Sequence, residues 1–320
     1  MKILVIGLGS MGQRRIRLLK KIQPDIEITA VESDNSRCVK VAKELNILCC
    51  SDIDSVNIRD YNGIIISTSP LTHCSLIKRL LDYDLPIFTE LNLVSDGYEV
   101  FKQNEDRLFL SSTLMYRKDL QYIQERVDKR RVNYNYHVGQ YLPDWHPWES
   151  YKQYFVNNKR TNGCREIMAI EFPWIVSCFG NVTGMHVIKD KMTELDIDYN
   201  DNYLIMLEHE TGTRGVITVD VVSRKAIRRL EIFSEEIHIF WDGTPQSLTE
   251  YNLEKKIMEN IAVYNTVEHN ALYSENIIED AYQEELNAFL QMIRQNDRSL
   301  VRYSFSKDEQ ILQLIDKIEN

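Results

Sequence analysis

Short apolar runs and amphipathic stretches alternate through the first third of the chain. The runs are rich in β-branched residues, which is typical of strands buried on both faces, and the stretches between them have the period of amphipathic helices. The predicted strands are residues 3–6, 26–31, 47–49, 63–67, 86–89 and 107–111. Strands that alternate with helices in this way predict an α/β fold with a Rossmann-type, doubly wound parallel sheet.

The pattern changes after a predicted helix at residues 118–129. Predicted strands then follow one another, interrupted by one helix at residues 164–179, and two amphipathic helices at 278–294 and 306–318 end the chain. These strands are residues 132–141, 184–188, 202–210, 215–222, 228–233 and 236–241. Successive strands predict an open, mostly antiparallel sheet. We therefore predict two domains, a doubly wound domain at 1–120 and an α+β domain at 121–320, with the last helix free to pack back on the first domain.

Three glycines follow the first strand in Gly-x-Gly-x-x-Gly spacing, at Gly7, Gly9 and Gly12. Gly7 suits a sharp turn, Gly9 leaves room for a pyrophosphate, and Gly12 lets the next helix lie close to the strand. The amides at the start of that helix, at Ser10 and Met11, would face the phosphates, where the helix dipole favours negative charge. The loop therefore predicts a dinucleotide site.

Glu32 ends the second predicted strand, about 20 residues beyond the glycines, where a carboxylate commonly binds the adenosine ribose. A carboxylate repels a 2′-phosphate, so Glu32 favours NAD over NADP. Arg37 is close enough in sequence to leave NADP open.

Polar residues follow the next strands, and ligands of doubly wound sheets gather at the carboxyl ends of strands. We expect the nicotinamide half of the cofactor to lie near these strand ends. The candidates are Ser67, Thr68, Ser69, Pro70 and Glu90, together with His73 at a helix start. For His73 we weigh a direct nicotinamide contact against packing or capping beside the cofactor.

Composition and charge narrow the class of protein. The chain has 320 residues, of which 43% are hydrophobic and 27% charged, and a formal net charge of -10. This charge argues against a nucleic-acid or anionic membrane partner. No run is long enough for a membrane span, and no metal-ligand constellation is visible. We expect a cytoplasmic protein whose six cysteines are reduced thiols.

The order of these elements resembles the glucose-fructose oxidoreductase / inositol dehydrogenase / rhizopine-catabolism (Gfo/Idh/MocA) family. The resemblance rests on GLGSMGQRR at 7–15, IIISTSPLTH at 64–73, FTEL at 88–91, RRLEIFSEE at 228–236 and AYQEELNAFLQMI at 281–293. It implies NAD(P)-dependent redox chemistry on a sugar or polyol, in a homodimer or homotetramer formed through the C-terminal sheet. The string GQYLPDWHPWESY at 139–151 is similar to members from bacterial surface-sugar pathways, including sialic-acid-like sugars.

Two departures from the family pattern concern proton transfer. The family's usual Glu-Lys-Pro is Glu90, Leu91, Asn92 here. The position of the family's histidine is taken by Ile170 or, with a one-residue shift, by Glu171. Leucine and isoleucine carry no proton, whereas oxidising an alcohol needs a base and reducing a ketone needs an acid. The candidate replacements are Glu166, His146 and Tyr141, and the candidate substrate contacts are Leu91, Tyr116, Gln140, Asp144, Trp145, Tyr151 and Arg165.

Several interpretations remain open at this stage. The aromatic string could be a platform for a sugar or a brace between domains, and Arg165 and Glu166 could be catalytic or form an ordinary ion pair. For the whole protein we weigh an NAD(P)-dependent sugar or nucleotide-sugar oxidoreductase in surface-glycan biosynthesis against a catalytically silent NAD(H) sensor. A lyase or epimerase that uses the bound cofactor transiently is the third hypothesis.

Overall fold

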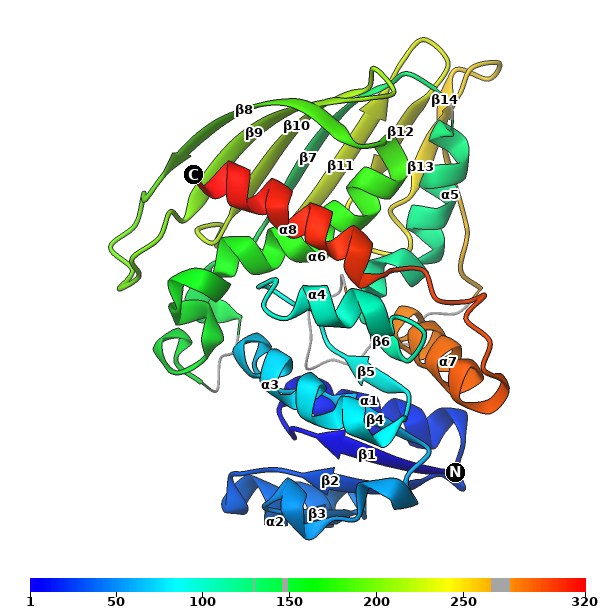
Figure 1. Cartoon of the computed structure of the whole chain (residues 1–320). Coiled ribbons are helices and arrows are strands. Elements are labelled where there is room, and N and C mark those ends of the chain that lie inside the picture. Colours follow the sequence, from blue (N-terminus) through cyan, green and yellow to red (C-terminus); the bar gives the residue numbers. More distant parts are fainter. Residues whose placement is uncertain (129, 146–148, 266–276) are drawn as a thin grey trace. The chain divides into compact units, whose positions relative to one another are not determined.

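The computed structural model describes residues 1–128, 130–145, 149–265 and 277–320, and the chain divides into two compact units (Figure 1). The first unit comprises Met1–Thr113 and Tyr282–Leu312, and the second comprises Leu114–Ala281 and Gln313–Asn320. The change of unit thus falls a few residues before the predicted boundary at 120, and residues 282–312 return to the first unit. The predicted fold class is confirmed, because one unit holds a parallel sheet and the other a mostly antiparallel sheet.

The first unit contains a six-stranded parallel sheet in the order β3-β2-β1-β4-β5-β6. This is the strand order of a Rossmann fold. Successive strands are added on one side of β1 up to β3 and on the other side from β4 onward, so the order of addition reverses between β1 and β4. The central strands are buried along almost their whole length. The strands are β1 Lys2–Ile6, β2 Glu27–Val31, β3 Leu48–Cys50, β4 Gly63–Ile66, β5 Ile87–Thr89 and β6 Leu108–Leu110.

Helices connect these strands, and two segments from the end of the chain join them. Phe289 packs against Phe88 and Phe109, so that α7 covers the β5–β6 side of the sheet. The buried Asp308 carboxylate accepts hydrogen bonds from the hydroxyls of Tyr98 and Tyr303, which ties α8 to α4. The helices are α1 Ser10–Ile22, α2 Asn35–Leu45, α3 Pro70–Leu80, α4 Tyr98–Phe101, α7 Glu279–Gln295 and α8 Phe305–Glu319, with 3-10 turns at Ile53–Ser55, Ile58–Asp60, Leu81–Tyr83 and Lys102–Asn104.

Cys38 on α2 and Cys49 on β3 form a disulfide, with their Cα atoms 5.8 Å apart. The expectation that all six cysteines are reduced is therefore wrong for this pair. Cysteines in these positions meet because α2 lies over the edge strand β3 of the sheet. Cys50, Cys74, Cys164 and Cys178 are free thiols.

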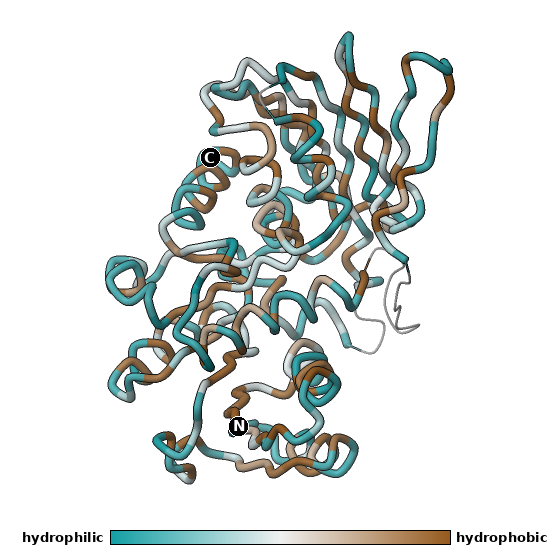
Figure 2. Tube along the Cα trace, turned by 90° about the vertical axis from the view of Figure 1, so that its right-hand side faces the viewer, coloured by the Kyte–Doolittle hydropathy of each residue, from teal (hydrophilic) through white to brown (hydrophobic). Residues whose placement is uncertain are grey.

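The second unit contains an eight-stranded sheet in the order β14-β13-β12-β11-β7-β10-β9-β8. Among the described strands of this sheet, only β7 and β10 pair in parallel, and the other neighbours pair antiparallel. Buried and exposed positions alternate along β9 and β10, as expected for a sheet with one covered face. Both hydrophobic and hydrophilic residues occur along the strands of this sheet (Figure 2). The strands are β7 Asn133–Gly139, β8 Val182–Asp190, β9 Asn202–His209, β10 Arg214–Asp220, β11 Ile227–Phe233, β12 His238–Trp241, β13 Thr249–Asn252 and β14 Ile257–Asn260.

Helix α6, Gly163–Phe179, covers one face of this sheet. Tyr134 stacks on Phe179, and Tyr136 meets Trp174 edge to face, so alternate residues of β7 point toward α6. The second unit also contains α5, Lys118–Val127, and short 3-10 turns between residues 142 and 161. Those turns are Leu142–Asp144, Tyr151–Gln153, Phe155–Asn157 and Lys159–Thr161, and Thr113–Tyr116 forms another at the change of unit. Among the described residues, no helix is long and apolar enough to cross a membrane.

Candidate functional site

The glycine loop lies at the point where the strand order of the first sheet reverses. Gly7 has a φ of 95°, and a Cβ on it would lie 2.5 Å from the carbonyl oxygen of Ser67. A Cβ on Gly12 would lie 2.0 Å from the carbonyl oxygen of Gly7. Helix α1 can therefore pack this close to the turn only because residue 12 has no side chain. Both positions therefore need glycine for the protein's own packing.

Gly9 differs from the other two, because a Cβ there would meet no protein atom within 4 Å. Its φ of -65° is also one that any residue adopts. Gly9 precedes α1, whose N-terminus carries no side-chain cap in the described chain and no acidic residue in its first turn. Open space beside an uncapped helix N-terminus fits a pyrophosphate.

Glu32 is buried at the end of β2 beside this loop. Its Oε2 accepts a hydrogen bond of 2.9 Å from the amide of Leu8, and its Oε1 accepts one of 3.0 Å from the amide of Asp34. Arg37 Nη1 lies 3.4 Å from Oε2. The carboxylate thus joins the glycine loop to the start of α2, and its remaining acceptor capacity on Oε1 fits a ribose hydroxyl.

His73 is buried in the first half of α3 and uses both ring nitrogens within the protein. Nε2 lies 3.1 Å from the carbonyl oxygen of Thr68, and Nδ1 lies 2.6 Å from Oδ1 of Asn92. Burial lowers the pKa of His73, which favours a neutral ring. Of the two roles considered for His73, its contacts favour packing that holds the turn 67–70 over a direct nicotinamide contact. Thr68 and Ser69 in this turn are half-buried.

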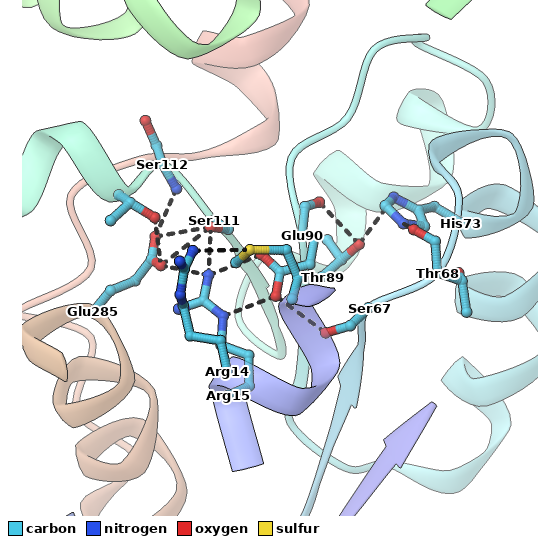
Figure 3. Close-up of polar contacts among 12 residues, drawn as sticks. Arg14, Arg15, Ser67, Thr68, His73, Thr89, Glu90, Ser111, Ser112 and Glu285 are labelled. Carbon is cyan, nitrogen blue, oxygen red and sulfur yellow. Dashed lines mark hydrogen bonds and ion pairs between the residues drawn. The ribbon is translucent and has the colours of Figure 1, made fainter. Parts of the chain in front are cut away.

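A buried ionic cluster connects α1 and α7 with the residues that follow β4, β5 and β6 (Figure 3). Arg15 on α1 donates to both oxygens of Glu90, each at 2.8 Å, and its Nη2 lies 2.8 Å from Oε2 of Glu285 on α7. Ser67 Oγ donates to Glu90 Oε1 at 3.1 Å, and Ser111 Oγ donates to Glu285 Oε1 at 3.0 Å. Glu90, predicted to face the cofactor, therefore has both oxygens engaged by Arg15.

Electrostatics of this cluster follow from burial and opposite charge. Burial works to lower the pKa of Arg15, but Glu90 and Glu285 together raise it above its ordinary value. Burial raises the pKa of Glu285, which Arg15 opposes. Arg15 and Glu285 were not among the predicted site residues. The available signal was two adjacent arginines in a helix with a mostly apolar buried side, since Leu18 and Leu19 are buried in α1 together with Arg14 and Arg15.

In the second unit, the start of the aromatic string lies against the first turn of α6. A Cβ on Gly163 would lie 3.0 Å from Leu142 and 3.5 Å from the ring of Trp145. Trp145 Nε1 donates to the carbonyl oxygen of Gln140 at 2.9 Å, and the guanidinium of Arg224 lies 3.8 Å from the ring centre of Tyr141. The string 140–145 and the start of α6 are therefore neighbours.

The turn that ends β10 fixes this string. The amide of Tyr141 donates to the carbonyl oxygen of Ser223 at 2.6 Å, and that of Leu142 donates to Val221 at 3.0 Å. Burial would raise the pKa of Asp220, but hydrogen bonds, the first from His137, hold it below its ordinary value. His137 thus has a partner within the protein, Asp220 Oδ2, at 2.7 Å.

Glu166 lies in the first turn and a half of α6. Asn162 begins the helix, with its side chain accepting from the amide of Arg165 at 2.8 Å. Oε2 of Glu166 is buried and has no hydrogen-bond partner among the described residues. Burial raises the pKa of Glu166 to about 8. Its charge adds to burial in raising the pKa of Tyr154 and of Tyr199, so both phenols are near this carboxyl.

Other predicted contacts have protein partners. Arg165 pairs with Glu319 and, at 2.8 Å, with Asp316 on α8, which is the ordinary ion pair weighed above. The hydroxyl of Tyr151 accepts from the amide of Asp196 at 3.1 Å. Tyr116 is buried, Leu91 half-buried and Asp144 exposed. His146 lies outside the described residues.

The loop, the strand order and Glu32 together define a dinucleotide-binding Rossmann domain. Residues 1–99 match the model of the GFO_IDH_MocA family, described as an oxidoreductase family with an NAD-binding Rossmann fold. Residues 1–99 therefore match the description of an NAD-binding Rossmann fold, as the sequence predicts. A search among curated proteins found no match.

Solved structures with the same fold cover the whole chain. A myo-inositol dehydrogenase from Corynebacterium glutamicum has a TM-score of 0.74 at 16% identity, over 99% of this chain and 95% of that one. An oxidoreductase from Agrobacterium radiobacter, in complex with NAD+, L-tartaric acid and magnesium, has a TM-score of 0.77 at 13% identity, over 99% of this chain and 94% of that one. UDP-N-acetylglucosamine 3-dehydrogenase from Acidithiobacillus ferrooxidans has a TM-score of 0.76 at 14% identity, over 99% of this chain and 96% of that one. At these identities the likeness shows the two-domain fold.

Proposed function

We propose that the protein is a cytoplasmic NAD-dependent oxidoreductase that acts on a sugar or nucleotide sugar in surface-glycan biosynthesis, with Glu166 as the proton-transfer residue. The NAD-binding domain supports the cofactor. The names of similar structures, which include an inositol dehydrogenase and a nucleotide-sugar dehydrogenase, support the substrate class.

The buried carboxyl of Glu166 carries the proposal. A group that transfers protons works best when its pKa lies near the working pH, and burial brings Glu166 to about 8. The resemblance places Leu91 at the family's usual lysine and Ile170 or Glu171 at its usual histidine. Leu91 and Ile170 transfer no proton, and both oxygens of Glu171 accept hydrogen bonds within the protein, from Tyr136 and Arg228 among others. A half-buried glutamate with an unpartnered oxygen at a helix start is therefore the best replacement in the described chain.

Bound NAD supplies or accepts the hydride in this chemistry. At pH 7 a carboxyl with a pKa of about 8 is mostly protonated, so Glu166 is an acid and can give its proton to the oxygen of a carbonyl being reduced. In the opposite direction the ionised form must accept the proton of the alcohol. Reduction should therefore slow as the pH rises through about 8, and oxidation should quicken.

The second candidate function is an NAD(H) sensor without turnover, favoured by Leu91 and Ile170. A panel of sugars and nucleotide sugars, followed by absorbance of reduced nicotinamide, distinguishes the two. Net oxidation or reduction supports the oxidoreductase, and NADH binding without any product supports the sensor. Product without a net change in nicotinamide supports a lyase or epimerase instead.

Substitutions at Gly9 and Gly7 test the cofactor site by opposite effects. Gly9→Val should leave the unfolding temperature nearly unchanged, because a Cβ at this position meets no protein atom within 4 Å, but should abolish NADH binding by filling the space for the pyrophosphate. Gly7→Ala should destabilise the fold by about 1–3 kcal/mol, because its φ of 95° is strained for alanine and its Cβ meets Ser67. NADH titration and thermal unfolding measure both. Normal NADH affinity in Gly9→Val would contradict the predicted site.

The outer face of the second sheet supports the predicted homo-oligomer. Met206 pairs across strands with Val216, and Leu204 pairs with Ile188, and all four side chains are exposed. Contiguous exposed apolar residues mark interaction sites, and the same face on a second copy can cover them in a two-fold dimer. We propose that a second copy binds here.

Met206→Glu tests this face, because it would place like charges opposite each other in a two-fold interface. Light scattering should show a monomer for Met206→Glu and a larger species for the unaltered protein, with NADH affinity unchanged. Lys189→Glu, a charge change on neighbouring β8 outside the apolar group, is the control. A monomeric unaltered protein would rule out the interface.

A further inference from the structure

The Cys38–Cys49 disulfide borders the carboxylate predicted to bind the adenosine ribose. Cys38 lies in the first turns of α2, directly after Arg37, whose Nη1 is 3.4 Å from Glu32 Oε2. Cys49 lies on β3, and the next residue, Cys50, accepts a hydrogen bond of 3.0 Å from the amide of Glu32. The disulfide therefore joins the two segments that flank Glu32.

These two segments are thinly packed. Within α2, all of which the structure describes, only Cys38 and Val41 are buried. All three residues of the edge strand β3 are exposed or half-buried. With so little apolar contact, a covalent link from Cys38 to Cys49 is a large part of what holds α2 to the sheet.

The start of α2 in turn fixes the carboxylate of Glu32. Asp34 begins the helix by accepting from the amides of Ser36 and Arg37 at 2.9 and 3.0 Å. The amide of Asp34 donates to Glu32 Oε1 at 3.0 Å. A shift of the start of α2 would therefore move both Asp34 and Arg37, which hold the two oxygens of Glu32.

We propose that Cys38–Cys49 is a thiol-exchange site, opened by a dithiol reductant, and that its opening weakens binding of the adenosine half of NAD. The proposal rests on the proposed role of Glu32 in holding the cofactor. Oxidised, the link keeps the ribose acceptor preorganised. When the disulfide is reduced, α2 and β3 separate more easily. NAD binding must then also order these two segments, which lowers the affinity.

The exchange follows the accessibility of the two sulfurs. Cys49 is half-buried and Cys38 is buried, so a thiolate of the reductant attacks Cys49 Sγ. The Cys38–Cys49 bond breaks, and Cys38 leaves as a thiolate that takes up a proton. The start of a helix stabilises such a thiolate. The second thiol of the reductant then attacks the reductant's first sulfur, which is bonded to Cys49 in the mixed disulfide. This step releases Cys49 as a thiol and leaves the reductant as an internal disulfide.

The first measurement establishes the link itself. The protein is purified without reductant, exposed to an oxidised dithiol, and alkylated, and peptide mass mapping identifies the protected cysteines. We expect Cys38 and Cys49 to be protected until dithiothreitol is added, with Cys50 alkylated throughout. Alkylation of Cys38 and Cys49 before reduction would overturn the proposal.

The second measurement is affinity for ADP-ribose, which contains the adenosine half without nicotinamide. Dithiothreitol should weaken binding to the unaltered protein by roughly five-fold or more, the lower end of typical coupling between sites. Cys38→Ser and Cys49→Ser should bind like the reduced protein with or without reductant. Cys50→Ser is the matched control and should keep the full response.

Two negative results have different meanings. Equal ADP-ribose affinity of the oxidised and reduced unaltered protein would overturn the proposal and leave the cofactor site standing. Failure of both forms to bind ADP-ribose would overturn the role of Glu32 and the proposed function with it. Using the reduced unaltered protein avoids dependence on variants that fail to fold.

Discussion

Glu166→Gln is expected to lower turnover by roughly 10²- to 10⁴-fold, the usual effect of losing a general acid or base. Glutamine has nearly the same shape and can fill the same buried position, but it has no proton to transfer at neutral pH. NADH binding should be unchanged, because Gly7, Gly9 and Glu32 lie in the other unit of the chain. Steady-state rates with the substrate found in the panel, and NADH titration, measure the two effects.

The pH dependence distinguishes a proton-transfer role from a structural one. The unaltered protein should lose its reductive rate as the pH rises through about 8, and Glu166→Gln should have a flat residual rate. Glu125→Gln, an exposed carboxyl on α5, is the control and should keep both rate and pH profile. An unchanged rate in Glu166→Gln would remove Glu166 from the mechanism.

Stability gives a readout that needs no substrate. Because burial raises the pKa of Glu166 from 4.5 to about 8, the folded state holds this proton more tightly than the unfolded state. The resulting stability is present below pH 4.5 and is lost as the pH rises through about 8. The difference in unfolding temperature between Glu166→Gln and the unaltered protein should therefore change with pH. The variant should gain relative stability between neutral pH and pH above 8, as thermal unfolding would show.

The glycine loop was predictable because its chemistry is local. Gly7, Gly9 and Gly12 lie within one strand, turn and helix. The backbone and the packing restrict Gly7 and Gly12, and Gly9 leaves open space at the helix start. The β-branched runs likewise predicted the strands of the parallel sheet. In contrast, β13 and β14 were not predicted, because their residues are half-buried or exposed and do not alternate.

Contacts between distant residues account for most of what sequence could not supply. Arg15 and Glu285 are 270 positions apart, and nothing local indicates that they meet. Cys38 and Cys49 are close in sequence, but only the packing of α2 over β3 brings them to disulfide distance. For Glu166 the residue type was predictable, whereas its raised pKa follows from burial that appears only in the folded chain.

Arg15→Met is expected to destabilise the first unit by about 3–5 kcal/mol, because removing one partner of a buried ion pair leaves the others uncompensated. Arg15 has no exposed surface, and without it Glu90 and Glu285 would face each other in a buried site. Denaturant unfolding measures the loss. Arg17→Met, an exposed position on the same helix, should change stability by less than about 0.5 kcal/mol.

Neutralising the carboxylates tests whether charge is the cause. Adding Glu90→Gln and Glu285→Gln to Arg15→Met should recover much of the lost stability, because a buried ionic group replaced as a whole costs far less than one that is broken. If Arg15→Met unfolds like Arg17→Met, the cluster contributes nothing to the fold. If the triple variant is no more stable than Arg15→Met alone, the loss comes from packing around Phe88 and Tyr282, over whose rings Arg15 lies, rather than from unpaired charge.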